Sequence, residues 1–422
     1  MSTFLQQLEK DSQSLMQLWN PELRQKAYAA FLNQGLPSTK LESWRYTSLQ
    51  KMAELPFESK SSVHQAELPS LEKRCRITLI NGQFSREHSS LHLPAGVEFK
   101  PLSEALKNGL QLEALATTPE NALNNLNTAF FLDGAYLRIS ANTQVEEVLE
   151  ILCIQDASHL QAFYPKNVIE LESAAYAHVQ ERYISLHHEC YLMNASTEIK
   201  LGDNAELHYY RSQEEDKKAF HLSSVRVSQK RNSRFYSYGL FLGSGLNHNH
   251  LQSSLKEEGA ECNLLGLYLG GETQHLDNYT LIDHATPHCR SNELYKGILE
   301  EEASASFQGH ILVQPHAVKT ESRQLNKNLL LSPKASVNTK PLLEIYNNDV
   351  KCNHGATIGK LDEKQLFYLR SRGLDAQEAK SLLTLAFASD WLSEIKQDLL
   401  FKEFRCRILT HFFPKTVLSP LP

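Results

Sequence analysis

The sequence lacks every compact signature of the common enzyme classes. It contains no G-x-x-x-x-G-K-[ST] loop for nucleotide phosphates, no G-x-S-x-G nucleophile turn and no H-E-x-x-H zinc motif. The segment GSGLNHNH misses the third glycine and the helical pattern of a dinucleotide-binding fingerprint. These absences argue against P-loop ATP hydrolysis by this chain, and they favour a scaffold or a subunit of a larger complex.

Long apolar runs and blocks of positive charge are also missing. No stretch is long enough to span a bilayer, and the N-terminal MSTFLQQLEKDSQSL lacks the basic-then-apolar layout of a secretory signal. The 422 residues carry 43 Lys and Arg against 49 Asp and Glu, for a formal net charge of −6, which disfavours nucleic-acid binding. We therefore expect a cytoplasmic protein with no nucleic-acid partner and no membrane partner.

Cysteine is sparse and scattered. The seven cysteines form no C-x-x-C pair, and they match no zinc or iron–sulfur spacing that one chain completes. Their odd number fits reduced thiols better than a disulfide framework. A metal bound here would therefore draw only part of its ligands from this chain.

Helical patterns occupy both ends of the chain, and short strands fill the middle. Apolar spacing predicts helices near the N-terminus and again near the C-terminus. In the middle, short β-branched and aromatic runs alternate with Gly, Asn, Asp and Ser, which is typical of strands and turns. We expect a mixed helical part over 1–135, a β core over 136–360 and a helical part over 361–422.

The β core carries a weak internal repeat. Strand-like segments open at five small residues: Ala205, Ser233, Ala260, Ala303 and Ala335. Subtracting these positions gives steps of 28, 27, 43 and 32 residues, which suit the stacked coils of a β-solenoid. The 43-residue step then predicts an insertion. A β-sandwich, which also has many short strands, is the alternative.

The segment DVKCNHGATIG (349–359) holds the first candidate site. Cys352 and His354 are two positions apart, so an extended strand directs both side chains to one face. Thiolate and imidazole are both good ligands for zinc and iron. The neighbouring Asn, Asp and Gly residues are poor core material. A buried structural cysteine beside an unrelated histidine fits the spacing equally well.

Three further clusters contain histidines whose roles stay open: His187 with His188, His248 with His250, and His284 with His288. The first cluster is interpreted as half-buried strand positions. The second lies beside GSG and predicts a solenoid turn, and the third lies at a turn marked by Pro287.

A resemblance to the SufD family of iron–sulfur cluster assembly proteins, in the SufB/SufD superfamily, rests on two segments. They are KLESWRYTSL and HILVQPHAVKTESRQLNKNLLLSPKASVNTKPLLEIYNNDVKCNHGATIGKLDEKQLFYLRSRGL. The resemblance is strongest over about 290–395. A SufB-like chain would carry a glutamate-containing EHEAT in place of CNHGAT, together with a cysteine-rich N-terminal part, so this chain looks like SufD rather than SufB.

This resemblance implies a mainly β fold, with a right-handed parallel β-helix core flanked by N-terminal and C-terminal α-helical domains. It implies a non-catalytic scaffold in a SufB–SufC–SufD complex, where a SufB-like chain joins the β-helix end and a SufC-like ATPase binds the C-terminal helices. A transient iron–sulfur cluster would be shared with SufB at His354, beside Cys352. No cofactor bound tightly by this chain alone is expected. A flavin in the complex and a homodimer without SufB stay open.

The predicted SufC docking surface follows the β core. The segment QLFYLRSRG combines apolar anchors with basic groups, and we expect the contact at five residues: Leu366, Phe367, Leu369, Arg370 and Arg372. The alternative for Leu366 and Leu369 is packing within the helical domain.

Two competing functions come from other classes. A β-helix enzyme acting on polysaccharide would need paired carboxylates on one face, and no convincing pair stands near His354. A purely structural interaction subunit would use neither Cys352 nor His354 chemically.

Overall fold

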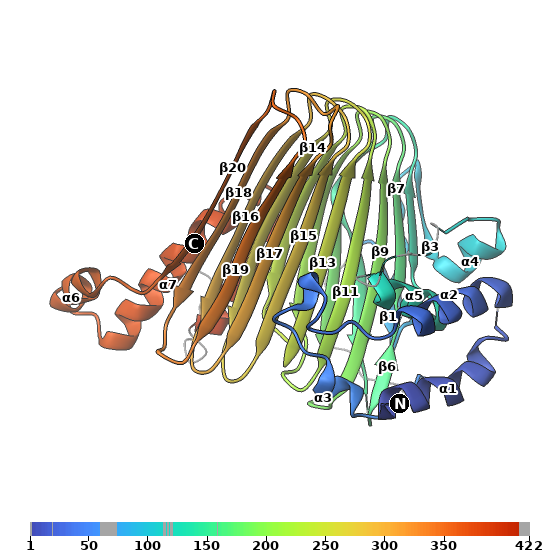
Figure 1. Cartoon of the computed structure of the whole chain (residues 1–422), viewed down its shortest axis with the longest axis horizontal. Helices are drawn as coiled ribbons and strands as arrows, with labels where there is room; N and C mark the ends of the chain where they lie inside the picture. Colours follow the sequence, from blue (N-terminus) through green and yellow to red (C-terminus); the bar gives the residue numbers. More distant parts are fainter. Residues whose placement is uncertain are drawn as a thin grey trace.

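The structure is a computed structural model with a long β-solenoid as its body and helices at both ends of the chain (Figure 1). It describes the following residues: 2–18, 20–59, 74–112, 115, 118, 121–157 and 159–412. The predicted mainly β class, with a parallel solenoid core between terminal helices, is confirmed. No helix within these ranges is long and apolar enough to cross a membrane.

Successive strands of the solenoid alternate between two sheets, so each coil contributes one strand to each sheet. Sheet 1 consists, in spatial order, of β2 (Gln83–Ser90), β1 (Arg76–Ile80), β5 (Gln144–Gln155), β8 (Tyr176–Ser185), β10 (Glu206–Glu214), β12 (Arg234–Phe241), β14 (Glu261–Gly270), β16 (Arg290–Leu299), β18 (Glu321–Leu330) and β20 (Lys351–Gly359). All neighbours in it are parallel except β1 and β2.

Sheet 2 faces sheet 1 across the core. It consists, in spatial order, of β19 (Ser336–Ile345), β17 (Ser304–Val313), β15 (His275–His284), β13 (Leu246–Leu255), β11 (Phe220–Gln229), β9 (Tyr191–Leu201), β7 (Lys166–Leu171), β4 (Ala135–Ile139) and β3 (Val97–Pro101), and the short β6 (Gln161–Phe163) also pairs with β9. Only β3 and β4 pair antiparallel.

The predicted insertion in the 43-residue step is wrong. Ala260 precedes β14 of sheet 1, whereas Ala303 precedes β17 of sheet 2. The step therefore crosses from one sheet to the other. Strands of both sheets open with a small residue because the corner of each coil leaves little room, and Ala205, Ala260 and Ala303 are fully buried there. The parallel coil-to-coil register also excludes the β-sandwich.

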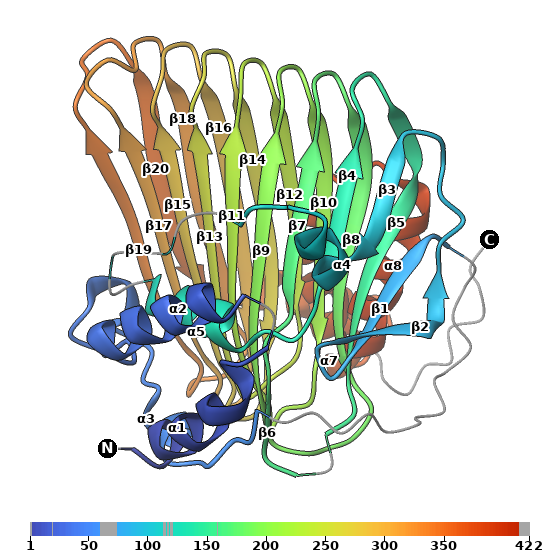
Figure 2. The ribbon, with the colours of Figure 1, turned by 90° about the vertical axis from the view of Figure 1, so that its right-hand side faces the viewer.

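Three large apolar cores stabilise the described part of the molecule. The interior core lies between the two sheets and contains side chains of both, such as Leu264 and Phe307. A second core joins the N-terminal helices to the outer face of sheet 2, as Figure 2 shows. A third joins the C-terminal helices to the outer face of sheet 1, where Trp391 and Phe404 pack on Leu267. Each helical part therefore covers a different sheet.

The N-terminal helical elements are α1 (Thr3–Leu15), α2 (Pro21–Gln34), η1 (Glu42–Trp44), α3 (Gln50–Ala53), α4 (Leu102–Lys107) and α5 (Ala122–Phe130). The C-terminal helices are α6 (Glu363–Ser371), α7 (Ala376–Leu392) and α8 (Asp398–Phe412). A capping box formed by Asp375 and Glu378 starts α7. Sequence analysis did not predict α5, whose three asparagines are weak helix formers. All nine of its residues are buried, so packing stabilises it.

A polar network anchors the segment around η1 to sheet 2. The indole of Trp44 stacks on the imidazole of His248, with 3.8 Å between the ring centroids. His248 Nδ1 lies 2.9 Å from Asp277 Oδ2, and the Thr47 hydroxyl donates to the same carboxylate oxygen at 2.5 Å. All four side chains are buried. The N-terminal segment is therefore held by hydrogen bonds as well as by apolar packing.

Candidate functional site

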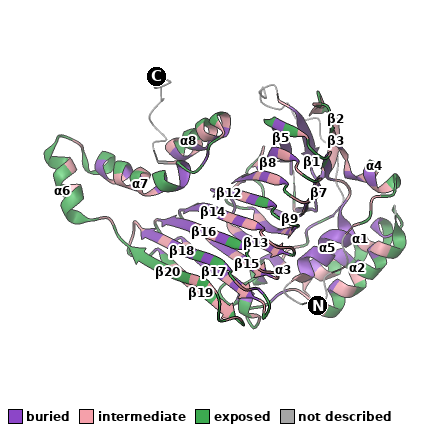
Figure 3. Ribbon diagram, turned by 90° about the horizontal axis from the view of Figure 1, so that it is seen from above, coloured by how far each residue is buried: buried purple, intermediate pink, exposed green. Residues whose placement is uncertain are grey.

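The C-terminal coil leaves the solenoid open. β19 and β20 are the last strands of their sheets, and no other described strand pairs with their free edges. Unlike the preceding coils, neither strand has a buried residue: β20 is mostly exposed, and β19 mixes half-buried and exposed positions (Figure 3). Exposed large apolar side chains gather there: Leu342, Ile345, Tyr346 and Ile358. Because a terminal coil without a cap exposes core surface to water, this open end has the character of an interface.

The two predicted ligand residues lie on β20, at the free edge. Cys352 pairs in register with Ser322, and His354 pairs with Gln324 of β18. Cys352 is half-buried and packs with the Ile311, Val313 and Ala317 cluster, whereas His354 is exposed. The predicted strand geometry is therefore present, with both side chains on one face of the strand.

Burial raises the pKa of the Cys352 thiol, and a backbone hydrogen bond at Ser322 lowers it by a smaller amount. The thiol is therefore protonated at neutral pH in the free chain. A metal or cluster that binds the sulfur must displace this proton.

One row of polar side chains inside the solenoid leads to His354. The register aligns Glu293, Gln324 and His354 on three successive strands of sheet 1. Gln324 Nε2 donates to Glu293 Oε2 at 2.6 Å, and both side chains are fully buried. Burial raises the pKa of Glu293 to about 7, against hydrogen bonds that lower it. A carboxyl group that holds or releases a proton near neutral pH thus stands two strands behind His354.

A second polar row leads to Cys352. His284 Nε2 lies 2.8 Å from Ser291 Oγ, and Ser291 Oγ lies 2.8 Å from Ser322 Oγ, which precedes Cys352 in register. Of the residues in these rows, only His284, Cys352 and His354 were predicted from the sequence. A search for polar residues at the coil spacing would have found the others, since Glu293, Gln324 and His354 are 31 and 30 residues apart.

The described part of the chain contains no complete metal site. Within the described ranges, no group of three or more His, Cys, Asp and Glu side chains could hold a metal ion. Cys352 and His354 stand alone as neighbouring soft ligands on an open edge. A complete coordination shell at this position needs ligands from another molecule.

The same two residues offer backbone groups to a further strand. The Lys351 N–H donates to Thr320 O at 2.8 Å, which directs it toward β18. Because alternate residues of a strand bond to opposite sides, the N–H and C=O of Cys352, His354 and Ala356 point out of the sheet. On β19 the Ser336 N–H bonds toward β17, so Pro341 falls in the outward set and removes a donor there. β20 is therefore the better edge for strand addition.

Four of the predicted docking residues lie on α6, which projects from the body (Figure 1), and Arg372 directly follows the helix. No residue of α6 is buried, and Phe367 is 76% exposed. Leu366, Phe367 and Arg370 line a groove with Leu331 and Leu361 beside the solenoid.

The other docking residues lie outside that groove. The Arg372 guanidinium lies 5.2 Å from the centre of the exposed Tyr368 ring, a residue that sequence analysis did not select. Leu369 is half-buried. Leu366 is half-buried as well, so both leucines pack partly within the chain and keep part of their surface in contact with solvent.

The remaining histidine clusters have structural environments. His187 and His188 lie in the connection between β8 and β9, so the strand interpretation is wrong; each lies within 2.8 Å of a carboxylate, of Asp156 and Asp216 respectively. His248 and His250 lie on strand β13, so the predicted turn there is also wrong. The GSG segment (243–245) itself lies in the connection between β12 and β13.

The third cluster matches its interpretation as a turn. His284 ends β15, and His288 adopts a positive φ of 60° beside Pro287. His288 Nε2 lies 3.7 Å from Glu258 Oε1. Neither histidine meets a set of metal ligands.

Buried histidines make the stability of the fold sensitive to mild acid. Burial lowers the pKa of His178 to about 4, of His250 to about 3 and of His284 to about 4. Below pH ~6.5 these histidines bind protons in the unfolded chain but stay neutral in the folded chain. The free energy of unfolding therefore falls as the pH drops toward 4. Glu293, with its raised pKa, opposes the loss. We expect a net loss of about 2–4 kcal/mol between pH 7 and pH 5, measured by urea unfolding. Equal or greater stability at pH 5 would contradict this expectation.

Comparison with known proteins agrees with this architecture. The family model "SufBD protein N-terminal region" matches residues 2–151, and "SUF system FeS cluster assembly, SufBD core domain" matches residues 153–387. An iron–sulfur cluster assembly SufBD family protein of Synechocystis is 33% identical over 384 residues, which cover 85% of this chain and 84% of the relative. The iron–sulfur cluster assembly protein SufD of Escherichia coli is 26% identical over 386 residues, 89% of each chain.

The matches extend over both the N-terminal helical part and the solenoid, and they confirm the resemblance seen in the sequence. The chain is a member of the SufBD family of iron–sulfur cluster assembly proteins.

Proposed function

We propose that this chain is a SufD-type, non-catalytic scaffold subunit of a SufB–SufC–SufD complex. In this proposal the open end of the solenoid joins a SufB-like chain, and a nascent iron–sulfur cluster is shared across that junction. The observation that carries the proposal is the position of Cys352 and His354 on an unpaired edge strand of an uncapped coil.

The chemistry of the open end supports a shared site. Exposed His354 and half-buried Cys352 are two ligands of the type that iron–sulfur clusters accept. The partner would complete the shell, so the cluster forms only at the junction. The exposed apolar side chains at this end, among them Leu342 and Ile358, would be covered by the same partner.

A SufC-like ATPase would bind at α6. The helix presents Phe367 and Tyr368 to solvent beside Arg370 and Arg372, and exposed aromatic and arginine side chains are the usual anchors of protein interfaces. The ATPase activity would reside on that partner. A helix that projects from the body would transmit the partner's movement to the solenoid.

Co-purification tests the assembly. This chain alone would be tagged and expressed with SufB-like and SufC-like proteins, and the masses and stoichiometry of the eluted complex would be determined. We expect both partners to elute with it. Recovery of the tagged chain alone, with both partners folded in the lysate, would contradict the proposal.

Replacing His354 with alanine tests the shared site. His354→Ala removes a ligand without touching the core, so the complex should still assemble while its cluster content falls about tenfold, measured by iron, acid-labile sulfide and visible absorbance. His92→Ala is the matched control, since His92 is also exposed but lies outside the last coil. Equal cluster content in both variants would favour a purely structural subunit.

A further inference from the structure

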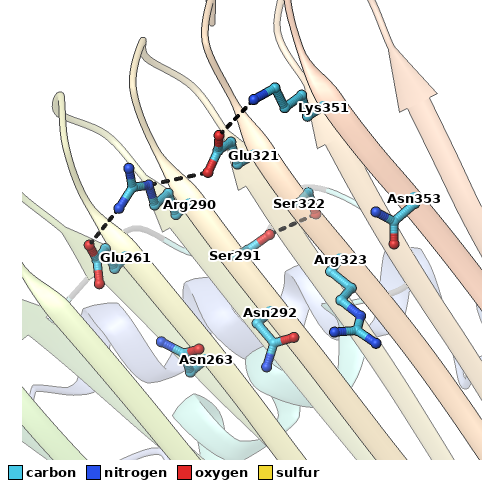
Figure 4. A pocket seen from close by; sticks show the side chains of 10 residues that line it. All are labelled: Glu261, Asn263, Arg290, Ser291, Asn292, Glu321, Ser322, Arg323, Lys351 and Asn353. Carbon is cyan, nitrogen blue, oxygen red and sulfur yellow. Dashed lines mark hydrogen bonds and ion pairs between the residues drawn. The ribbon is translucent and has the colours of Figure 1, made fainter.

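A row of alternating charges crosses the outer face of sheet 1. Its members occupy the same register position on six successive strands, and we call them the charge row: Glu206, Arg234, Glu261, Arg290, Glu321 and Lys351. Figure 4 shows the last four, which line a shallow depression above two rows of polar side chains. The sign of the charge alternates from each strand to the next, so no member of the charge row lies opposite a like charge on the neighbouring strand.

The ion pairs follow the row to the edge of the sheet. Arg234 Nε donates to Glu206 Oε2 at 2.6 Å. Arg290 lies between two carboxylates, 4.0 Å from Glu261 and 3.5 Å from Glu321. Glu321 likewise lies between Arg290 and Lys351, whose Nζ is 3.6 Å away. Arg290 and Glu321 therefore each lie between two opposite charges.

Lys351 is the last member of the charge row and has a member of the row on one side only. It contacts Glu321 on β18, its side chain is 85% exposed, and no other described strand pairs with β20 on its free side. A strand added to that edge would lie about 4.8 Å away and would place one side chain opposite Lys351. A cation there would repel Lys351, whereas an anion would continue the alternation.

A second copy of this chain does not supply that anion. The strand β20 reads KCNHGATIG and contains no acidic residue. The nearest acids, Asp349 and Asp362, lie outside the strand, and Asp362 already caps α6. Pairing of β20 with its own copy would therefore leave Lys351 without a carboxylate, which favours a different chain as the occupant.

We propose that the partner strand added to β20 carries an Asp or Glu opposite Lys351, and that this pair sets the register of the junction. The inference rests on the proposed pairing with a SufB-like chain. A slip by one residue would turn the acid to the opposite face. A slip by two residues would place the acid opposite Asn353, which is neutral and is the next residue on the same face of β20. Correct register is what brings partner ligands level with Cys352 and His354.

Charge reversal tests the pair. The dissociation constant between this chain and the SufB-like chain would be measured for wild type, Lys351→Glu and the control Lys230→Glu, an exposed lysine on a distant turn. We expect Lys351→Glu to weaken binding about tenfold and Lys230→Glu to leave it unchanged. Each acid on the partner's edge strand would then be replaced by lysine. One of these variants should restore binding to Lys351→Glu within about threefold.

The outcomes separate this inference from the proposed function. If wild type binds the SufB-like chain but Lys351→Glu binds equally well, or if no partner variant restores binding, the acidic counterpart is refuted while the pairing stands. If wild type binds no SufB-like chain, the proposed function fails and this inference fails with it. Self-association that depends on Lys351 would refute the choice of a different chain.

Discussion

Replacing Ala356 with proline is expected to abolish pairing at the open end while leaving the fold intact. The Ala356 N–H points away from β18, toward the free edge, because the Lys351 N–H bonds inward and the direction alternates. Proline removes that outward donor and its ring blocks a neighbouring strand, yet it breaks no hydrogen bond within the chain. We expect binding of the SufB-like chain to weaken about 100-fold or more, measured by titration calorimetry.

The neighbouring position provides the matched control. The Thr357 N–H points inward to β18, so Thr357→Pro should instead lower the free energy of unfolding by about 3 kcal/mol. Ala356→Ser should behave as wild type in both assays. Normal binding by Ala356→Pro would show that the partner does not add a strand to β20.

Removing the Asp277 carboxylate is expected to destabilise the whole N-terminal attachment. Asp277 is fully buried; burial alone would raise its pKa, but contacts with His248, Thr47 and His275 lower it overall, so it is ionised at neutral pH. Asp277→Ala would leave His248 Nδ1 without its carboxylate partner and the Thr47 hydroxyl with only His275 Nε2, which lies 2.8 Å away. We expect a loss of about 3–5 kcal/mol in the free energy of unfolding at pH 7, measured by chemical denaturation.

The hydrogen-bonded network around Asp277 predicts which segment the substitution destabilises first. Trp44 stacks on His248, so loss of the carboxylate should also expose the segment around η1 to proteases. Asp283→Ala on the same strand is the control, because Asp283 is only half-buried and accepts one hydrogen bond from Gln314. It should lose less than about 1.5 kcal/mol. Equal losses in the two variants would show that the buried network contributes little.

The candidate site shows which features can be predicted from the spacing of residues in the sequence alone. Cys352 and His354 are two residues apart, and the alternation of a strand is local geometry, so their shared face follows from the sequence. Glu293 and Gln324 stand behind His354 only because the coils stack in one register. That register depends on the length of every turn between the strands. Because the turns differ slightly in length, aligned residues are not separated by a constant number of positions in the sequence.

The errors have the same origin. The step from Ala260 to Ala303 was predicted to contain an insertion because segments of both sheets open with a small residue. His248 was placed in a turn because of the glycines before it, although it lies on β13. Local composition indicates where the corners of the coils lie, but it does not indicate to which sheet the following strand belongs.

By itself, the sequence determined the alternation of terminal helices with a strand-rich middle, and the position of Cys352 and His354 on one face of a strand. These features depend on residues within a few positions of each other. Tertiary structure alone decided which strand ends each sheet, which backbone groups face outward, and that six charges separated by 27 to 31 residues form one row ending at Lys351. Such contacts arise only when successive coils stack, since each coil buries its side chains against the next one.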